Sequence, residues 1–410
     1  MENPKIRFKG FTKDWEQRKF SELVTIERGG SPRPIDKFIT NDENGLNWVK
    51  IGDAPEQGNY ITQTAEKIRP EGLSKTREVH PGDLILSNSM SFGRPYIMAI
   101  DGCIHDGWLA IRDTKKNFDL KFLCTLLGTD GMLNQYKAMA AGSTVNNLNK
   151  ELVGGTTVAF PMVEEQIKIG DYFTTLDHLI TLHQRKCEQT KKLKKYMLQK
   201  MFPRNGAKVP EIRFDGFTYD WEQRKLGEIY GSIGNAFVGT ATPYYAEHGH
   251  FYLESNNVKD GQINHNAEIF INDEFYEKQK DKWLHTGDMV MVQSGHVGHA
   301  AVIPEELDNT AAHALIMFRN PKEEIEPYFL NYEYQTDKAK KQIENITTGN
   351  TIKHILASDM QEFVVDIPKY EEQKVIASYF CKLDHLITLH QRKCDELKKM
   401  KKYMLQNMFI

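Results

Sequence analysis

Apolar side chains recur at alternating four- and three-residue steps in two stretches of this 410-residue chain, 164–203 and 371–410. Such spacing is typical of helices in a coiled coil. Each helix would be about 50 Å long at 1.5 Å per residue and marginal alone, so we expect the two to pack together. The predicted seam residues are Tyr172, Leu176, Leu179, His183, Lys186, Thr190, Leu193 and Met197 in the first stretch, and Tyr379, Leu383, Leu386, His390, Lys393, Leu397, Met400 and Met404 in the second.

Residues 1–163 and 211–370 have a different pattern, in which short β-branched and aromatic runs alternate with Gly, Asn, Asp and Pro. These runs predict strands, for example at 84–86, 108–111 and 289–292, while 120–140 and 328–346 have helical spacing. Pro203, Gly206 and Pro210 end the first long helix, so 204–210 is predicted to be a linker. The sequence therefore predicts an α/β (α+β) protein with two globular domains and two long coiled-coil helices.

The chain is internally duplicated. The run Leu-Asp-His-Leu-Ile-Thr-Leu-His-Gln-Arg-Lys-Cys occurs at 176–187 and again at 383–394, and Trp-Glu-Gln-Arg-Lys occurs at 15–19 and 221–225. The period of about 206 residues is far longer than that of solenoid repeats, so it indicates two homologous domains related by a pseudo-two-fold axis. Between these blocks the halves diverge but still align, as Gly82-Asp83 does with Gly287-Asp288. Matched scaffold positions with divergent loops are expected of one fold adapted to two targets.

Composition narrows the class of protein. The net charge is −3 and the pI about 6.5, which argues against a freestanding nucleic-acid binder but not against DNA binding within a complex. The five cysteines stand singly, so neither a disulfide framework nor a zinc site is expected. No apolar run of about 18 residues and no signal-peptide core are found, which predicts a cytoplasmic protein without membrane contact. The lysines near 186–200 are explained most simply as a solvated helix face.

Motifs for catalysis are absent from the sequence. It contains no glycine-rich cofactor loop, no Asn/Asp-Pro-Pro-aromatic segment, no G-x-x-x-x-G-K-S/T phosphate loop and no H-E-x-x-H motif. His178 and His183, repeated as His385 and His390, are five residues apart and about 140° apart on a helix, which disfavours a metal site. We therefore expect a binding protein and no enzyme.

The plan of the chain resembles the specificity subunit of type I restriction-modification enzymes. The resemblance covers essentially the whole chain and rests on the two Trp-Glu-Gln-Arg-Lys segments, the turns at 142–144 and 349–351, and the Phe160-Pro161 and Ile367-Pro368 pairs, each followed by Glu-Glu-Gln and a long helix. It implies that 1–163 and 211–370 are target recognition domains, each binding one half of a split, asymmetric site in double-stranded DNA.

The resemblance also implies roles for the helices and for partner subunits. The helices at 164–203 and 371–410 would pack antiparallel, set the spacing between the two recognition domains and dock two modification (methyltransferase) subunits. Restriction (motor-nuclease) subunits would complete the bacterial enzyme. S-adenosylmethionine, ATP and Mg²⁺ would bind those partners, with no cofactor in this chain.

Base contacts require polar side chains on loops that reach the edges of a DNA groove. The candidates in the first half are Ser31, Arg33, Lys50, Asn88, Ser89, Ser91, Arg94, Ser143, Asn146 and Asn147. The candidates in the second half are Asn235, Thr240, Asn256, Asn257, Gln293, Ser294, His296, His299, Asn350, Lys353 and His354. Alternatively, these residues only form turns or, at Ser143 and Asn350, cap helices.

Arg94 and His299 are the sharpest contrast between the aligned halves, so we expect Arg94→Ala to affect the first half-site alone. Two rival functions stay open at this point. The chain could be a coiled-coil assembly scaffold that binds no DNA, or a nuclease without recognisable motifs.

Overall fold

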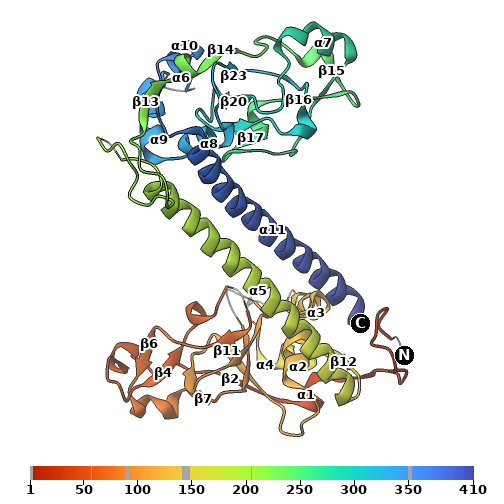
Figure 1. Ribbon diagram of the computed structural model, residues 1–410. Coiled ribbons are helices and arrows are strands. Elements are labelled where there is room, and N and C mark those ends of the chain that lie inside the picture. The colour runs from red at the N-terminus through yellow and green to blue at the C-terminus, as the bar shows by residue number, and fades with distance from the viewer. Residues whose placement is uncertain (1–2, 57, 89–91, 141–147, 205, 350–352) are drawn as a thin grey trace. The chain divides into compact units, whose positions relative to one another are not determined.

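The computed structural model describes residues 3–56, 58–88, 92–140, 148–204, 206–349 and 353–410 (Figure 1). The chain forms two compact units. Unit 1 consists of 1–186 together with 390–410, and unit 2 consists of 187–389. The long helices α5 (Val163–Lys200) and α11 (Tyr370–Met408) therefore each contribute one part to either unit. In the described part of the chain, no helix is apolar over a length that would cross a bilayer.

Unit 1 contains two five-stranded sheets and a two-stranded one. The first large sheet has the order β2 (Thr25–Arg28), β11 (Trp108–Arg112), β8 (Leu84–Ser87), β9 (Pro95–Met98) and β5 (Tyr60–Ile61). The second has the order β3 (Ile39–Thr40), β6 (Glu66–Ile68), β4 (Leu46–Val49), β10 (Gly102–Ile104) and β7 (Arg77–Val79). The small sheet pairs β1 (Glu16–Lys19) with β12 (Thr157–Phe160). The helices are α1 (Phe20–Leu23), α2 (Leu120–Leu127), α3 (Asp130–Ala140) and α4 (Lys150–Gly155), with 3-10 turns η1 (Ile35–Lys37), η2 (Ile51–Asp53) and η3 (Pro70–Lys75).

Unit 2 repeats this plan. Its sheets have the orders β14 (Tyr230–Asn235), β23 (Leu315–Pro321), β20 (Met289–Val292), β21 (Ala300–Val302), and β15 (Tyr245–Ala246), β19 (Phe270–Ile271), β16 (His250–Leu253), β22 (Ala311–Ala312). The small pairs are β13 (Glu222–Lys225) with β24 (Val364–Ile367), and β17 (Val258–Lys259) with β18 (Gln262–Ile263). The helices are α6 (Leu226–Ile229), α7 (Asp273–Lys278), α8 (Pro327–Glu333), α9 (Asp337–Ile346) and α10 (Ala357–Gln361), with 3-10 turns η4 (Thr242–Tyr244), η5 (Ser255–Asn257), η6 (Lys280–Lys282) and η7 (Glu305–Leu307).

The strand registers confirm the duplication. Glu16 is paired with Phe160 in unit 1, and Glu222 is paired with Ile367 in unit 2, so the repeated Trp-Glu-Gln-Arg-Lys segments form the same two-stranded ladder. Strands β8 and β20 are buried along their whole length, which explains why both consist of nearly unbroken apolar runs. The mixed α/β architecture predicted from the sequence is therefore present in both units.

A buried ion pair holds the start of each repeat against a long helix. Arg7 donates from Nε and Nη2 to the two carboxylate oxygens of Glu165, at 2.9 and 2.7 Å, and Glu165 is fully buried. Arg213 and Glu372 form the same bidentate pair in unit 2, with both distances 2.7 Å. These hydrogen bonds raise the pKa of both guanidinium groups. The second Glu of each Glu-Glu-Gln repeat is therefore explained by this ion pair, because a charged carboxylate is needed to accept both guanidinium hydrogen bonds.

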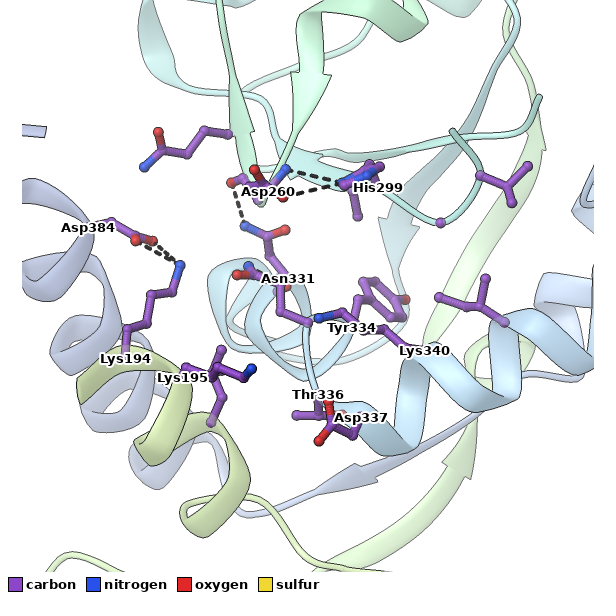
Figure 2. Close-up of a pocket in the computed structure, with 18 of the residues that line it drawn as sticks. Lys194, Lys195, Asp260, His299, Asn331, Tyr334, Thr336, Asp337, Lys340 and Asp384 are labelled. Carbon is purple, nitrogen blue, oxygen red and sulfur yellow. Dashed lines mark hydrogen bonds and ion pairs between the residues drawn. The ribbon is translucent and has the colours of Figure 1, made fainter. Parts of the chain in front are cut away.

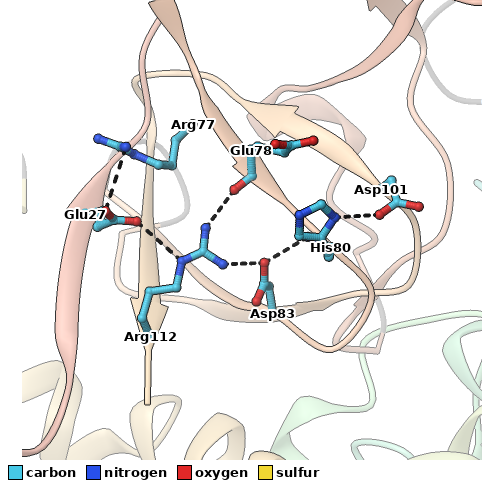
Figure 3. A network of polar contacts seen from close by, with 7 residues as sticks. All are labelled: Glu27, Arg77, Glu78, His80, Asp83, Asp101 and Arg112. Carbon is cyan, nitrogen blue, oxygen red and sulfur yellow. Dashed lines mark hydrogen bonds and ion pairs between the residues drawn. The ribbon is translucent and has the colours of Figure 1, made fainter. Parts of the chain in front are cut away.

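The matched Gly-Asp and Arg positions of the sheet have a structural role. In unit 1, Arg112 of β11 donates to the carboxylates of Asp83 and Glu27 and to the carbonyl of Glu78 (Figure 3). Asp83 also accepts the backbone N–H of His80, at 2.8 Å. The network fixes the turn before β8 against its neighbours. Conservation of this pair between the halves therefore reflects the scaffold.

The two long helices are antiparallel within each unit. In unit 1, Asp177 of α5 pairs with Lys401 of α11, and further along α5 His183 contacts His390, whose Nδ1 lies 3.0 Å from that of His183. In unit 2, Cys187 lies against the carbonyl of Ile387, and Lys194 pairs with Asp384. In both cases the partner number falls as the α5 number rises, which confirms the predicted antiparallel packing.

The predicted seam is correct at alternate positions and wrong at the others. Leu176, Leu383 and Leu397 are buried, and the histidines of the seam are in contact. By contrast, Leu193 (45% exposed), Leu386 (41%) and Met400 (47%) face outward, as do Lys186 and Lys393. The true seam uses the residue that follows each of these, so that it contains Phe173, Ile180, Cys187, Lys194, Phe380, Ile387, Cys394 and Lys401.

Adjacent apolar residues explain the error. Tyr172 and Leu179 precede Phe173 and Ile180, and all four are apolar, so a 4-3 pattern fits two helix phases about 100° apart. Tyr172, Leu179 and Tyr379 are half-buried beside the globular cores instead. Met197 and Met404 are likewise half-buried at the helix ends.

Candidate nucleic-acid interface

Three predicted loops of unit 1 meet at the turn formed by residues 105–107, just before β11. Ser31 donates from Oγ to Asp106 Oδ1, at 2.8 Å, and the side-chain amide of Asn88 donates to the Asp106 carbonyl, at 2.9 Å. The N–H of Leu148, which follows the segment 143–147, donates to the carbonyl of Asn88, at 3.0 Å. Segments far apart in the sequence therefore converge on one polar cluster around Asp106.

The electrostatics of this cluster favour an ionised Asp106. Burial opposes ionisation, but the Ser31 hydroxyl and the charges of His105 and Arg28 lower the pKa of the carboxyl below its usual value. Burial lowers the pKa of His105, which favours the neutral imidazole that can either donate or accept. The cluster thus presents an anion and a neutral imidazole, a combination suited to donors on a base edge.

Two cations stand at the margin of the cluster. The Arg33 side chain is 83% exposed and its guanidinium lies 3.9 Å from Asp106, so it is held only loosely. Lys50 is half-buried and forms a 2.6 Å ion pair with Glu66. Arg33 is consequently the more accessible of the two to a phosphate or a guanine edge.

Arg94 has a different environment from the one expected. Its Nη2 donates to the carbonyls of Glu56 and Gly58, at 3.0 and 3.2 Å, and its guanidinium lies over the Tyr96 ring at 5.0 Å. These contacts tie the segment before β5 to β9. Base contact by Arg94 stays a prediction, but the structure gives this side chain a positioning role.

The homologous cluster in unit 2 has the same backbone frame. The N–H of Ile355 donates to the Gln293 carbonyl, at 2.9 Å, just as Leu148 does to Asn88. The N–H of Gly295 donates to the Lys353 carbonyl, at 3.1 Å, and Ser294 forms a β-bridge with His354. Two predicted loops, 293–299 and 353–354, therefore lie side by side.

Different side chains fill this frame. His313 stands where unit 1 has His105, since Tyr252 and Ala311 pair as Trp48 and Cys103 do. Unit 2 has one residue fewer before β23, so it lacks a counterpart of Asp106. The Nδ1 of His313 lies 3.3 Å from Glu254 Oε1, and its Nε2 lies 2.9 Å from the Gly239 carbonyl. The exposed candidates of unit 2 are Asn235, Thr240, Asn256, His296, Lys353 and His354. The Oε1 atom of Gln293 is buried without a hydrogen-bond partner among the described residues.

His299 is half-buried beside Asp260. The N–H of Asp260 donates to His299 Nδ1 at 3.2 Å, and burial lowers the pKa of this imidazole. His299 is thus an acceptor within the protein, which leaves Nε2 as its outward-facing nitrogen to be used by a ligand.

Two predicted base contacts are wrong. Asn88 is 3% exposed and Asn257 is 2% exposed, so neither side chain reaches a groove. Asn257 accepts the Glu254 N–H and donates to the carbonyls of Asn264 and Asn266, which closes a turn. The turn-forming alternative is therefore correct for these two asparagines. Ser89, Ser91, Ser143, Asn146, Asn147 and Asn350 lie outside the described residues.

Four residues of these clusters were not predicted from the sequence as candidates for base contact: His105, Asp106, Glu254 and His313. Their positions in the sequence could have identified them. Glu254 directly follows β16, and the other three lie just before β11 or β23, in regions where the flanking residues of the two halves align. Trp48 pairs with Cys103 in unit 1, and Tyr252 pairs with Ala311 in unit 2, so the two frames are equivalent. Each cluster offers hydrogen-bond donors and acceptors to a ligand.

Comparisons with known proteins agree with this arrangement. The family model described as "Type I restriction modification DNA specificity domain" matches residues 12–192 and again 219–399. A putative MjaX specificity subunit of a type I restriction enzyme from Methanocaldococcus jannaschii is 24% identical, over 96% of this chain and 92% of that protein. The EcoBI specificity subunit of Escherichia coli is 20% identical, over 88% of this chain and 77% of its own length.

The fold has solved counterparts. The crystal structure of a type I restriction-modification S subunit from M. genitalium covers 100% of this chain and 99% of its own, with a TM-score of 0.65 at 14% identity. A structure from work on complex assembly of the type I R-M system has a TM-score of 0.51 at 18% identity, covering 97% and 98% of the two chains. At these identities the likeness establishes the fold of the whole chain.

Proposed function

The chain belongs to the type I restriction-modification DNA specificity family, and from this premise we propose that each of its units binds one half of a bipartite DNA site. DNA recognition is the role of this family, and the matched segments include both globular regions and most of both long helices. The rival hypothesis of a scaffold without DNA binding has no support in the fold or in the relatives.

The observation that carries the proposal is one backbone frame with two sets of side chains. In both units, loops from three segments meet before the central strand β11 or β23. Unit 1 places Asp106 and Lys50 there beside His105, whereas unit 2 places Glu254 beside the matching His313 and has no counterpart of Asp106. Since donors and acceptors on the protein select the complementary base edges, the two half-sites are unlike and the full site is asymmetric.

The exposed apolar residues of the long helices support a second part of the proposal. In unit 2, Leu193 and Tyr196 of α5 and Leu386 and Leu389 of α11 are each at least 41% exposed. In unit 1, Met400 and Tyr403 of α11 occupy the positions of Leu193 and Tyr196. We call these six residues the apolar stripe. Exposed apolar side chains at helical spacing are typical of a surface that packs against another protein.

The occupant of the apolar stripe, we propose, is the modification subunit. Part of the stripe is repeated, because Met400 and Tyr403 in unit 1 match Leu193 and Tyr196 in unit 2. Two matching sites fit two copies of one partner. Restriction subunits would join the resulting complex. Methyl transfer, ATP use and Mg²⁺ binding would belong to these partners, because the sequence has the motifs for none of them.

One experiment tests the function as a whole. Methylated positions are mapped across the genome of cells with and without this chain, with the partner genes present in both. The proposal predicts a split, asymmetric methylated sequence that depends on the chain. Methylation that persists unchanged without the chain, or that occurs at a palindrome, would contradict it.

A further inference from the structure

A pocket of about 830 Å³ lies in unit 2 beside the base-contacting loops (Figure 2). Its walls come from α5, α8 and α9, and from the turns at 260–262 and 297–299. Lys353 and His299, both predicted to contact DNA, line its rim. The pocket is therefore continuous with the candidate interface but is not part of the polar cluster around His313.

Four lysines from three segments line this pocket. Lys191 and Lys195 come from α5, Lys340 comes from α9, and Lys353 comes from the loop after the segment 350–352. Figure 2 shows Lys195 on α5 and Lys340 on α9. Across the described residues, no ion pair is formed by any of the four. Lys194, by contrast, is committed to Asp384 at 2.7 Å and lies over the Tyr332 ring. The four unpaired lysines are thus available to an external anion.

The acidic residues of the pocket are mostly engaged within the protein. Asp384 is neutralised by Lys194 and also accepts the Tyr332 hydroxyl, at 2.8 Å. Asp337 stands in the first turn of α9 and accepts the Gln199 amide, at 3.2 Å. Asp260 lies 3.8 Å from His299. Only Glu344 opposes the four lysines without a contact of its own in the described residues.

The inner wall also has polar atoms that lack partners. The Tyr334 hydroxyl and the Asn331 Oδ1 are buried without a hydrogen bond to any described residue, although these residues are only 2% and 1% exposed. Burying such atoms costs free energy unless water or a ligand satisfies them.

We propose that this lysine pocket binds the phosphodiester backbone of DNA next to the half-site contacted by unit 2. The inference rests on the proposed function and adds to it a contact with the DNA backbone that does not depend on base sequence. An acidic chain with a net charge of −3 needs locally concentrated cations to approach a polyanion. Ammonium groups on flexible stems suit phosphate contact, which positions the duplex without selecting its sequence.

The helix faces favour DNA over an acidic partner protein. Each helical residue turns by about 100°, so Leu193 and Lys195 lie on opposite sides of the seam residue Lys194. The apolar stripe thus occupies one side of α5, and the lysines occupy the other. A partner that covers the stripe leaves the lysine pocket open.

The same arrangement recurs in unit 1, where a pocket of about 620 Å³ is lined by Lys398, Lys402 and the Thr129-Asp130 turn. These residues correspond to Lys191, Lys195 and Thr336-Asp337. Leu133 stands in place of Lys340, so the unit 1 pocket is less basic. Phosphate binding is therefore stronger at the unit 2 pocket than at the unit 1 pocket.

The test measures the salt dependence of DNA binding by the chain assembled with its modification subunits. For each lysine that neutralises a phosphate, log K falls with log salt by a slope of about 0.9. Lys191→Gln, Lys195→Gln and Lys340→Gln should each reduce the slope by up to that amount, on specific and nonspecific DNA alike. The methylated sequence should stay the same. Lys192→Gln, an exposed lysine of α5 outside the pocket, is the matched control and should leave the slope unchanged.

Each alternative result has a definite meaning. If the variant that carries all three lysine substitutions has an unchanged slope, the proposal that the lysine pocket binds phosphate is overturned. The bipartite recognition would remain intact in that case. Reduced assembly with modification subunits, at an unchanged slope, would assign the pocket to an acidic protein partner and also overturn the proposal. If the unaltered complex shows no preference for any DNA sequence, the proposed function itself fails.

Discussion

Lys50 and Glu254 occupy the same backbone position in the two units and carry opposite charges. Each directly precedes a 3-10 turn, and the side chain of the third turn residue, Asp53 or Asn257, accepts the N–H of Lys50 or Glu254. Lys50 pairs with Glu66, whereas Glu254 lies 3.3 Å from His313 and accepts the Tyr245 hydroxyl, at 2.8 Å. The backbone conformation is therefore the same in both units, whereas the charge of the side chain at this position is opposite.

Removing the charge at Lys50 should therefore alter one half-site only. We expect Lys50→Gln to weaken discrimination at the half-site contacted by unit 1 by about 1–2 kcal/mol, because a good polar contact to a base edge contributes about 1–3 kcal/mol. Mapping of methylated sites measures this directly. Glu254→Gln is the matched control and should relax the other half-site. If either substitution changed both half-sites, the units would not act separately.

The ion pair in the unit 2 seam should be important for stability. Lys194 and Asp384 have side chains only 12% and 13% exposed, so Asp384→Ala leaves a largely buried ammonium without its partner. We expect the free energy of unfolding to fall by about 3 kcal/mol, measured by denaturant titration.

The double variant Lys194→Met with Asp384→Leu should recover most of that loss, since apolar residues of similar size replace both charges. The exposed pair Lys278–Glu274 serves as control, and its removal should leave the free energy of unfolding nearly unchanged. Equal losses in the buried and exposed pairs would contradict the assignment.

The His183–His390 contact predicts loss of stability in acid. Burial first, and then the charges of His390, Lys186 and Lys393, lower the pKa of His183 below its ordinary value of about 6.5. The unfolded chain therefore binds protons at a higher pH than the folded one. The contribution of His183 is fully present above about pH 6.5 and is lost as the pH falls toward its folded pKa.

Thermal unfolding of the chain between pH 7.5 and pH 5 measures this effect. His183→Asn should flatten the acid limb of the stability profile, with little change at pH 7.5. His178→Asn, an exposed histidine on the same helix, should leave the profile as it is. A profile unaffected by His183→Asn would show that this contact does not resist protonation.

Gly298 should not tolerate a side chain. It has φ of +84°, and a Cβ built on it would lie 2.8 Å from Ile343 Cγ2. Gly298→Ala should destabilise the chain by about 2–4 kcal/mol, from backbone strain and overpacking together. Gly287, with φ of +88° and open space around its Cβ position, isolates the backbone effect. Its replacement by Ala should cost about 1–2 kcal/mol in the same denaturant titration. Similar losses at both positions would exclude the packing contribution.

Much of the fold follows from the sequence because repetition and periodicity are strong signals. The duplicated blocks predicted two homologous units, and the 4-3 spacing predicted two paired helices, whose antiparallel direction the family resemblance implied. The phase of the seam was harder, since apolar residues such as Leu193 also face outward. Only the structure shows which apolar residues are buried against the other long helix and which are exposed to solvent.

The candidate site was predictable at the level of loops but not of single residues. The loops that hold Ser31 and Asn88 do meet at Asp106, and Leu148 joins them. Asn88 and Asn257 could not be separated from exposed asparagines, because hydrogen-bond partners distant in sequence decide their burial. His105 and Asp106 were missed because the sequence does not show that this turn is the point where the loops meet.

The central claim is that unit 2 alone determines its own half-site. The most direct test scans every base pair of the mapped DNA site for binding by the complex, with the unaltered chain and with Ser294 and His296 both replaced by Ala. The account predicts that discrimination falls at positions of one half-site and stays the same at the other. Discrimination that changes across both half-sites, or at neither, would contradict it.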